Sequence, residues 1–348
     1  MNDQASPIVV EVTRGDMVES RHHAAVAVVD IAGTVVLRAG DIERAVYARS
    51  AIKPLQALAL VESGAVDAFG LTEPEIALAC ASHSGEPRHT ATVRAWLERV
   101  GFTESDLECG AHAPLNSAAA ATLVRAGEKP SALHNNCSGK HAGFLTLARH
   151  IGASPAGYVR YDHPVQQRVL GILEQMTGLD LGDASRGIDG CGIPVIAIPL
   201  GSVALAMARL SEPGDQPEPR QAAAERIRGA MAAEPFLVAG TDRFDTRMIE
   251  ATNGRVLVKS GAEGVLCAIL AELGLGVALK VADGARRAAE VAMAHVIVRL
   301  GIPGIAAGDI GDLIEPAIIN RRSETVGKVR AISDTGHVAN SGTRNVLK

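Results

Sequence analysis

The N-terminal part of the chain has the hydrophobic pattern of β-strands. Residues 8–12 form a β-branched run that ends at the turn Arg14-Gly15-Asp16. Residues 24–31 and 34–38 are apolar runs on either side of Ala32-Gly33. Short β-branched runs separated by a glycine-containing turn are typical of a hairpin. The first 40 residues are therefore predicted to form strands.

The middle of the chain changes to the spacing of helices. From Ala51 to Gly64, apolar residues recur every third position, and Pro54 lies in the first turn, where its missing N–H costs little. Further helices are expected between Gly- and Pro-rich loops, at residues 73–81, 89–100, 117–126, 141–150, 164–177, 201–210 and 221–231.

Strand signals return late in the chain. Residues 254–259, 264–270 and 276–282 are short apolar runs bounded by glycine, and a helix is expected at residues 285–300. The order of strands, helices and again strands predicts an α/β (α+β) fold, in which both chain ends build an antiparallel sheet flanked by helices.

The same order predicts two domains. A discontinuous sheet domain is expected from residues 1–54 and 236–348, and a mainly helical inserted domain from residues 55–235. Catalytic groups are then expected in the cleft between the two domains.

Composition narrows the class of protein. With 348 residues, 47% hydrophobic and 21% charged, the chain has the composition of a globular protein and not of a disordered one. A net charge of −5 argues against a nucleic-acid partner, which requires a basic face. Five widely spaced cysteines do not suggest a disulfide framework. No signal segment is evident, and prolines interrupt the uncharged run 190–208, so we expect a soluble cytoplasmic protein without membrane contact.

The first candidate for chemistry is Ser50-Ala51-Ile52-Lys53 at a predicted helix start. A spacing of three puts the hydroxyl and the amine on one helix face, where a neutral lysine can take the serine proton. The alternative is a helix-capping serine followed by a surface lysine.

A second motif strengthens this interpretation. Lys259-Ser260-Gly261 ends a predicted strand, and serine β-lactamases and penicillin-binding proteins carry S-x-x-K, S-D-N and K-T-G in this order. Gly261 would allow the substrate backbone to approach closely. Taken alone, the motif is also compatible with an ordinary turn at a strand end.

The segment in the place of the middle motif, S-D-N, does not match that motif. Residues 80–86 read Cys-Ala-Ser-His-Ser-Gly-Glu, which is not S-D-N. Ser82 could still shuttle a proton, and His83 could hydrogen-bond substrate. A polar boundary between helix and loop is the competing interpretation.

The third constellation contains thiols, imidazoles and an amine. Cys137, Lys140 and His141 lie in His134–Gly143, and Asp189 and Cys191 follow downstream. Thiolate and nitrogen ligands suit zinc, and one cysteine from each segment with Lys140 or a histidine would make a site with an open position. Alternatively, His141 activates Cys137 as a nucleophile. The stretch S-G-K does not satisfy the phosphate-loop pattern.

Five motifs together carry a resemblance to a known family. They are R-S-A-I-K-P (49–54), C-A-S-H-S-G-E (80–86), H-N-N-C-S-G-K-H-A-G-F (134–144), D-G-C-G-I-P (189–194) and V-K-S-G-A-E-G (258–264). The chain closely resembles the thermolabile, rhizobial-type L-asparaginases over nearly its whole length.

This resemblance implies a serine β-lactamase/glutaminase-like fold, a homodimer, and hydrolysis of L-asparagine to L-aspartate and ammonia. It implies the catalytic pairs Ser50 with Lys53 and Ser82 with Lys259. It also implies a zinc ion held by Cys137, Lys140 and Cys191. The residues expected to bind substrate are Arg49, His83, His141, Asp189 and Gly261.

Three alternatives stay open at this point. The same site could take glutamine or a β-lactam, since one methylene changes binding by only about 1–3 kcal/mol. Zinc or the Cys137 thiol could drive an amidase reaction. The chain could also be a module that binds asparagine without turnover.

Overall fold

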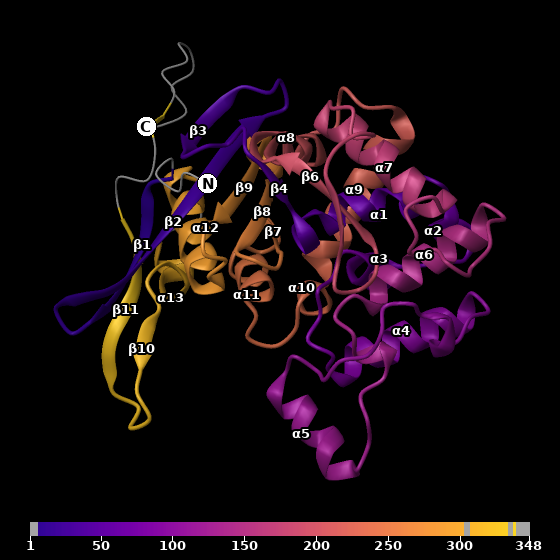
Figure 1. Ribbon diagram of the computed structural model, residues 1–348, viewed down its shortest axis with the longest axis horizontal. Coiled ribbons are helices and arrows are strands. Elements are labelled where there is room, and N and C mark those ends of the chain that lie inside the picture. Colours follow the sequence, from indigo (N-terminus) through magenta and orange to yellow (C-terminus); the bar gives the residue numbers. More distant parts are fainter. Residues whose placement is uncertain (1–5, 303–306, 333–336, 339–348) are drawn as a thin grey trace. The chain divides into compact units, whose positions relative to one another are not determined.

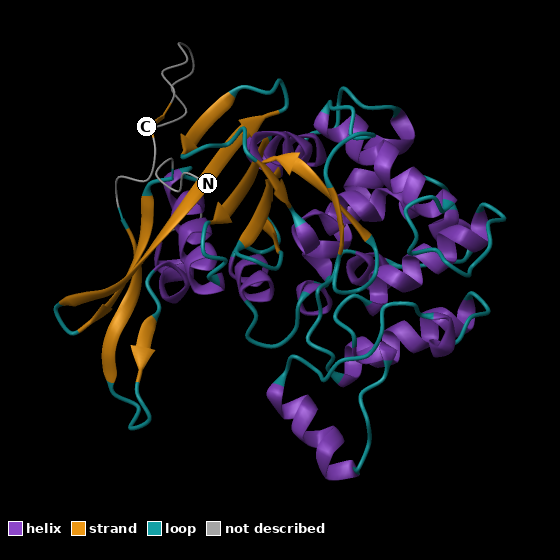
Figure 2. Ribbon diagram, viewed as in Figure 1, coloured by secondary structure: helices purple, strands orange, loops and turns teal. Residues whose placement is uncertain are grey.

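The computed structural model describes residues 6–302, 307–332 and 337–338, and these residues form two compact units. The first unit contains residues 1–51, 198–212 and 258–348, and the second contains residues 52–197 and 213–257. Figure 1 shows the elements of both units along the chain, and Figure 2 separates helices from strands. Each unit is considered by itself.

The first unit is built on an antiparallel sheet. Its strands are β1 (Ile8–Arg14), β2 (Met17–Asp30), β3 (Val35–Ala39), β7 (Leu257–Ser260), β8 (Val265–Leu270), β9 (Leu275–Val281), β10 (Ala317–Ile319), β11 (Thr325–Ala331) and β12 (His337–Val338). The order is β10-β11-β1-β2-β9-β8-β7, with β3 pairing with β2 and β12. Strands from both chain ends therefore lie side by side, as the sequence predicted.

Helices cover the centre of this sheet. Both α8 (Leu200–Ser211) and α12 (Arg286–Arg299) pack on β8 and β9. Every residue of β8 is buried, which a strand achieves only when both faces of the sheet are covered. The shorter elements of the unit are β4 (Ala45–Tyr47), η2 (Arg49–Ile52), η5 (Ala271–Leu273), η6 (Ala307–Ile310) and α13 (Gly311–Ile314).

The second unit is mainly helical. Its helices are α1 (Lys53–Val61), α2 (Ala65–Ala68), α3 (Glu73–Ala79), α4 (Pro87–Arg99), α5 (Ser117–Ala126), α6 (Ser138–His150), α7 (Pro164–Thr177), α9 (Glu218–Ala233), α10 (Pro235–Val238) and α11 (Phe244–Ala251). The short elements are η3 (Glu104–Asp106), η4 (Ala132–His134), β5 (Arg186–Ile188) and β6 (Pro194–Pro199). Within the described residues, no helix is both long enough and apolar enough to span a bilayer.

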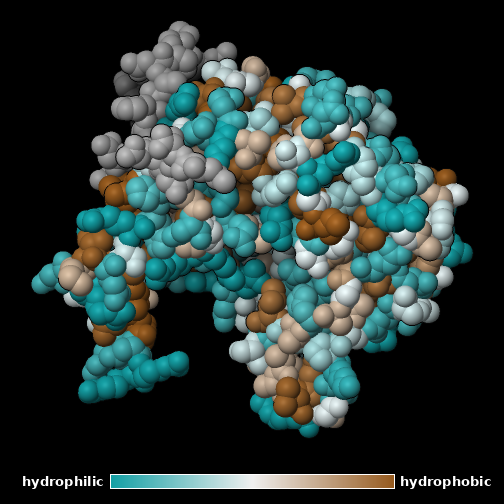
Figure 3. All heavy atoms as spheres, in the orientation of Figure 1, coloured by the Kyte–Doolittle hydropathy of each residue, from teal (hydrophilic) through white to brown (hydrophobic). Residues whose placement is uncertain are grey.

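Two helices occupy the centre of the second unit. All residues of α1 are buried, and so are residues 138–148 of α6. A helix that is buried all round is a core element and not an amphipathic surface helix. By contrast, α5 has no buried residue and exposes Val124, and hydrophobic atoms are visible over this projection in Figure 3. Polar side chains on α1 and α6 therefore lie in the core.

The predicted fold class is confirmed, while some limits of the parts differ from the expectation. The sequence assigned residues 201–210 to the helical domain, but α8 joins the sheet unit because it packs on β2 and β9. The change between units falls after Ala51 and after Leu257, not after residues 54 and 235. The strands β10 and β11 and the helix α11 were not foreseen.

Candidate functional site

Ser50 lies in the first unit on a strained turn. It is half-buried in η2, directly after Arg49, whose φ of 51° is in the left-handed region. A residue with a side chain pays roughly 1–2 kcal/mol for this conformation. Such strain is held in place by the surrounding structure, and it is concentrated at functional positions. The turn therefore presents Ser50 in a conformation that local preference alone would not select.

Gly261 brings the Lys259-Ser260-Gly261 motif against this turn. A Cβ atom at Gly261 would lie 2.9 Å from the Ala48 carbonyl oxygen and 3.1 Å from the Ala51 nitrogen, too close for any other residue. Lys259, at the end of β7, is buried, and its Nζ donates to the Ser260 carbonyl oxygen at 2.7 Å. The structure thus joins Lys259-Ser260-Gly261 to the segment that carries Ser50, as the order of the motifs suggested.

Lys53 begins α1 in the second unit, and it is not a surface lysine. The side chain is 1% exposed. Its Nζ donates to the Ala81 carbonyl oxygen, to Ser82 Oγ at 3.1 Å and to Cys137 Sγ at 3.1 Å. The Lys53 amine therefore connects segment 80–86 to segment 134–143 within this unit.

The segment 80–86 is held by hydrogen bonds to two other parts of the second unit. The Ser82 N–H donates to the Val238 carbonyl oxygen at 3.0 Å, and the His83 N–H donates to the Asn136 carbonyl oxygen at 3.1 Å. Ser84 Oγ donates to the Ala239 carbonyl oxygen at 2.9 Å. These contacts fix the backbone and leave Ser82 Oγ directed at Lys53.

His83 has protein partners at both ring nitrogens. Its Nδ1 accepts from the Gly85 N–H at 3.1 Å, so Nε2 carries the proton and donates to Ser138 Oγ at 2.9 Å. Burial, followed by the nearby His89 and Lys53, lowers the pKa of His83 well below its usual value. Because both ring nitrogens of His83 have protein partners, neither is free for the expected hydrogen bond to substrate. The ring instead connects segment 80–86 to α6.

Close packing and a polar cap position the start of α6. The Cys137 N–H donates to Asn135 Oδ1 at 2.8 Å. A Cβ atom at Gly139 would lie 2.4 Å from the Leu78 carbonyl oxygen, so only glycine lets α6 lie this close to α3. The H-N-N-C-S-G-K-H block therefore has a packing role in addition to any chemistry.

Two thiols and an amine meet beside Lys53. Lys140 Nζ donates to Cys191 Sγ at 3.0 Å. A hydrogen bond from Cys191 to Cys137, together with the charges of Lys53 and Lys140, holds the pKa of Cys137 well below its usual value despite burial. The same hydrogen bond and burial raise the pKa of Cys191. The thiolate form is therefore favoured at Cys137 and the thiol form at Cys191, and amines lie beside both sulfur atoms.

These three side chains have the chemistry of a zinc site. Sulfur and nitrogen are the preferred donors of zinc, and the ligands Cys137, Lys140 and Cys191 were expected from the sequence. Within the described residues, no group of three or more His, Cys, Asp or Glu side chains is placed to hold a metal ion. Two cysteines alone do not make a three-ligand zinc site, so Lys140 would have to supply the third ligand.

Asp189 stabilises the turn that presents Cys191. Its N–H donates to the Ile193 carbonyl oxygen at 2.8 Å, and its carbonyl oxygen accepts from the Gly192 N–H at 2.9 Å. Burial lowers the pKa of Lys140, but the two sulfur atoms and the Asp189 charge outweigh it and raise this pKa. Asp189 therefore contributes to the electrostatics of the cluster.

His141 is anchored at one nitrogen only. Its Nδ1 lies 2.7 Å from Tyr158 Oη, and Tyr158 Oη accepts from the Glu108 N–H at 2.8 Å. Nε2 is buried and has no hydrogen-bond partner within the part of the chain that the structure describes. Burial, and then the charges of Lys140 and Lys53, lower the pKa of His141 well below its usual value.

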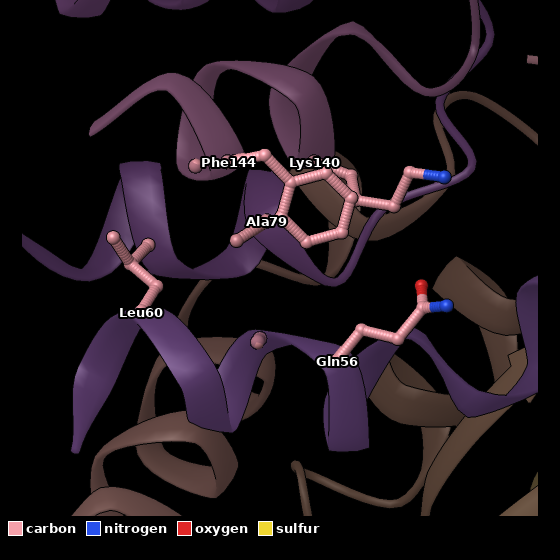
Figure 4. A pocket seen from close by; sticks show the side chains of 7 residues that line it. Gln56, Leu60, Ala79, Lys140 and Phe144 are labelled. Atoms are coloured by element: carbon pink, nitrogen blue, oxygen red, sulfur yellow. The ribbon is translucent and has the colours of Figure 1, made fainter. Parts of the chain in front are cut away.

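A small pocket lies against Lys140. It is lined by Gln56, Ala57, Leu60, Ala79, Lys140, Gly143 and Phe144. Figure 4 shows the Phe144 ring between α1 and α6, with the Gln56 amide and the Lys140 amine directed to the same side. Lys140 Nζ is 5.7 Å from the centre of the Phe144 ring. The pocket walls thus hold the aliphatic stem of Lys140 in an apolar environment.

Several residues of this cluster were missed by sequence reasoning. Tyr158 and Gln56 stand outside every motif, and Asn135 lies inside the block 134–144 but was assigned no role. Tyr158 is one of only three tyrosines in the chain, which is a weak signal at best. The strained φ of Arg49 has no sequence signal at all, because left-handed residues are usually glycine or asparagine.

Comparison with known proteins gives a family and a set of distantly similar solved structures. The sequence profile of a family described as L-asparaginase II matches residues 10–331. No curated protein matches the chain. A solved structure described as a β-lactamase from Mycobacterium bovis is 14% identical, with 84% of this chain and 95% of that chain covered and a TM-score of 0.41.

Proposed function

The chain belongs to the L-asparaginase II family and is an amidohydrolase that acts on L-asparagine, and we propose that Ser50 is its nucleophile and Lys53 its general base. The observation that carries this proposal is the contact of Gly261 with the Ala48–Ala51 backbone, since Gly261 lies 210 residues after Ala51 and the contact joins two motifs around Ser50. Strain at Arg49 and the burial of Lys53 support it.

The proposed first step forms a covalent intermediate. Lys53 takes the proton of Ser50, and Ser50 Oγ attacks the side-chain amide carbon of asparagine. Backbone N–H groups near Ser50 and in the Lys259–Ala262 segment stabilise the oxyanion. The C–N bond then breaks, and the nitrogen leaves as ammonia after it receives a proton.

Ser82 and Lys259 are proposed to complete the proton transfers. Ser82 Oγ lies 3.1 Å from Lys53 Nζ, which supports a route from Lys53 through the Ser82 hydroxyl to the leaving nitrogen. Lys259 is proposed to assist Ser82. Water then attacks the β-aspartyl ester, releases L-aspartate and returns the proton to Ser50.

Zinc is proposed to bind beside these groups. Cys137, Lys140 and Cys191 would hold it, because two thiols and an amine are converged by the contacts described above. A bound zinc ion supplies positive charge that orients the amino and carboxylate groups of an amino acid. Arg49 and Asp189 are proposed to contact the substrate, and His141 to lie close to it.

The test is ammonia release from L-asparagine by the wild type and by Ser50→Ala, with Ser20→Ala as a control serine on β2. Loss of release in Ser50→Ala alone supports the proposal. Release that survives Ser50→Ala would move the nucleophile elsewhere. The same assay with L-glutamine decides substrate preference, which a difference of one methylene leaves open.

Zinc is tested separately by metal analysis and by Cys137→Ser. If zinc mainly orients the substrate, this variant raises KM before it lowers kcat. Equal losses in kcat and kcat/KM would contradict that role for zinc.

A thiol nucleophile is the second candidate, because Cys137 has a lowered pKa and accepts from Lys53 at 3.1 Å. It predicts that Ser50→Ala keeps activity while Cys137→Ser loses it. We further propose a homodimer in the cytoplasm, which light scattering of the purified protein and fractionation of the source cells would check.

A further inference from the structure

The buried Nε2 of His141 has no protein partner. The ring is fully buried, and no residue that the structure describes lies within hydrogen-bond distance of this atom. Buried side-chain nitrogens are nearly always paired, and an exception calls for an explanation. His83, by contrast, has both nitrogens paired in the same unit. Nε2 of His141 is therefore left to a partner that the described residues do not supply.

The other nitrogen of the ring shows which form the imidazole takes. Tyr158 Oη lies 2.7 Å from His141 Nδ1 and accepts the Glu108 N–H. A phenol has one proton to donate. Within the described residues, His141 Nδ1 is the acceptor in reach of that proton. If Nδ1 carried a proton itself, the Tyr158 hydroxyl proton would have no partner.

A neutral imidazole whose Nδ1 accepts carries its proton on Nε2. We propose that Tyr158 is a positioning residue that holds His141 as the Nε2–H tautomer, so that His141 donates a hydrogen bond to a carboxylate oxygen of the amino-acid substrate. This inference rests on the proposed function. It also separates His141 from the metal ligands, because a protonated nitrogen cannot bind zinc.

The surroundings of His141 favour an anionic acceptor. His141 lies in the first turn of the 13-residue helix α6, whose N-terminal end carries a partial positive charge. It directly follows Lys140 in the chain, whose side chain carries an amine. A carboxylate oxygen accepts hydrogen bonds and adds no proton, so it complements a donor in a positive environment.

The tautomer is measured directly by long-range ¹⁵N–¹H NMR of histidine-labelled protein, with His141→Gln used to assign the signals. The expected result is a proton on Nε2 and a bare Nδ1 in the wild type, and a mixture of both tautomers in Tyr158→Phe. A wild-type His141 with its proton on Nδ1 overturns the proposal. So does the loss of the Nε2 proton when zinc is added.

Kinetics provide the second readout. Tyr158→Phe should raise KM for L-asparagine roughly threefold to tenfold and change kcat by less than about twofold, since a hydrogen bond to a charged group is weakened and not removed. Tyr161→Phe, at a half-buried ring beneath Arg186, is the matched control and should change neither. An equal fall in kcat and kcat/KM for Tyr158→Phe would contradict the positioning role.

Rescue distinguishes positioning from simple packing. Glutamine at position 141 keeps an N–H donor and has no tautomers, so Tyr158→Phe should have little further effect on KM in His141→Gln. A full additional effect would mean that Tyr158 acts only through packing. If the wild type itself released no ammonia from asparagine, the proposed function would fail, while the NMR result would still decide the tautomer.

Discussion

Segment 80–86 and the first turn of α6 each contain a buried histidine, but the two rings differ in what they leave unpaired. His83 uses one nitrogen to accept from Gly85 and the other to donate to Ser138. His141 uses one nitrogen toward Tyr158 and leaves the other free of protein partners among the described residues. The difference teaches that two equally buried histidines can differ in hydrogen bonding, and that the ring with an unpaired nitrogen is the one whose environment calls for an explanation.

Lys53 connects the two regions, and its removal should have the largest effect. Lys53→Ala deletes the proposed base and leaves Ser82 Oγ and Cys137 Sγ without their common donor. A general base contributes about 10²–10⁴ in rate, so kcat should fall by that factor. Steady-state ammonia release measures it. Lys129→Ala, on an exposed loop, should keep full activity, and a Lys53→Ala enzyme within tenfold of the wild type would exclude Lys53 as the base.

The two histidines should separate stability from substrate binding. His83→Ala leaves the Gly85 N–H unpaired, removes the donor to Ser138 Oγ and deletes a buried ring, so the free energy of unfolding should fall by about 2–4 kcal/mol. His141→Gln should raise KM instead and cost less than about 1.5 kcal/mol. Urea unfolding together with Michaelis kinetics checks both. Similar losses of stability in the two variants would erase the contrast.

Close packing at the start of α6 is tested by Gly139→Ala. The added methyl group would meet the Leu78 carbonyl oxygen at 2.4 Å, and α6 would have to shift away from α3 at a cost of roughly 1–3 kcal/mol. Gly171→Ala in α7 meets nothing within 4 Å and should stabilise the protein by about 0.5–1 kcal/mol. Thermal unfolding of the two variants should therefore shift in opposite directions.

Acid should weaken the fold through the two fully buried histidines, His83 and His141. Burial lowers the pKa of each ring in the folded state, so below the unfolded histidine value of about 6.5 the unfolded chain binds protons that the folded chain does not. Stability is then fully present above about pH 6.5, and each ring lowers it by up to about 1.4 kcal/mol per pH unit below that value. Urea unfolding between pH 5 and 8 measures the slope. His83→Gln should flatten this slope, and an unchanged slope would assign the acid sensitivity to other groups.

Much of the fold could be read from local patterns. The helices predicted at residues 117–126 and 164–177 match α5 and α7 residue for residue, since Asn116 and His163 cap them and glycine follows each. The strands β10 and β11 were missed because they are only partly buried and have no clear alternation. Helix 201–210 was recognised, but its assignment to the helical domain depended on contacts far away in sequence.

The sequence by itself determined the chemistry that is available. Residue identity and spacing place a serine three residues before a lysine, a second lysine at a strand end, and a cysteine three residues before Lys140. These spacings are local, and the family match over residues 10–331 also rests on residue identity alone. Neither depends on how the side chains pack.

Only the tertiary structure decided how each of these groups is used. His83 directly follows Ser82, and His141 directly follows Lys140, each inside its motif. Nothing in the sequence shows which of the two rings has both nitrogens paired. The distinction comes from Ser138, Tyr158 and the Glu108 N–H, which lie 55, 17 and 50 residues from the groups they meet. Hydrogen bonding depends on distance and direction in space, and folding alone sets both.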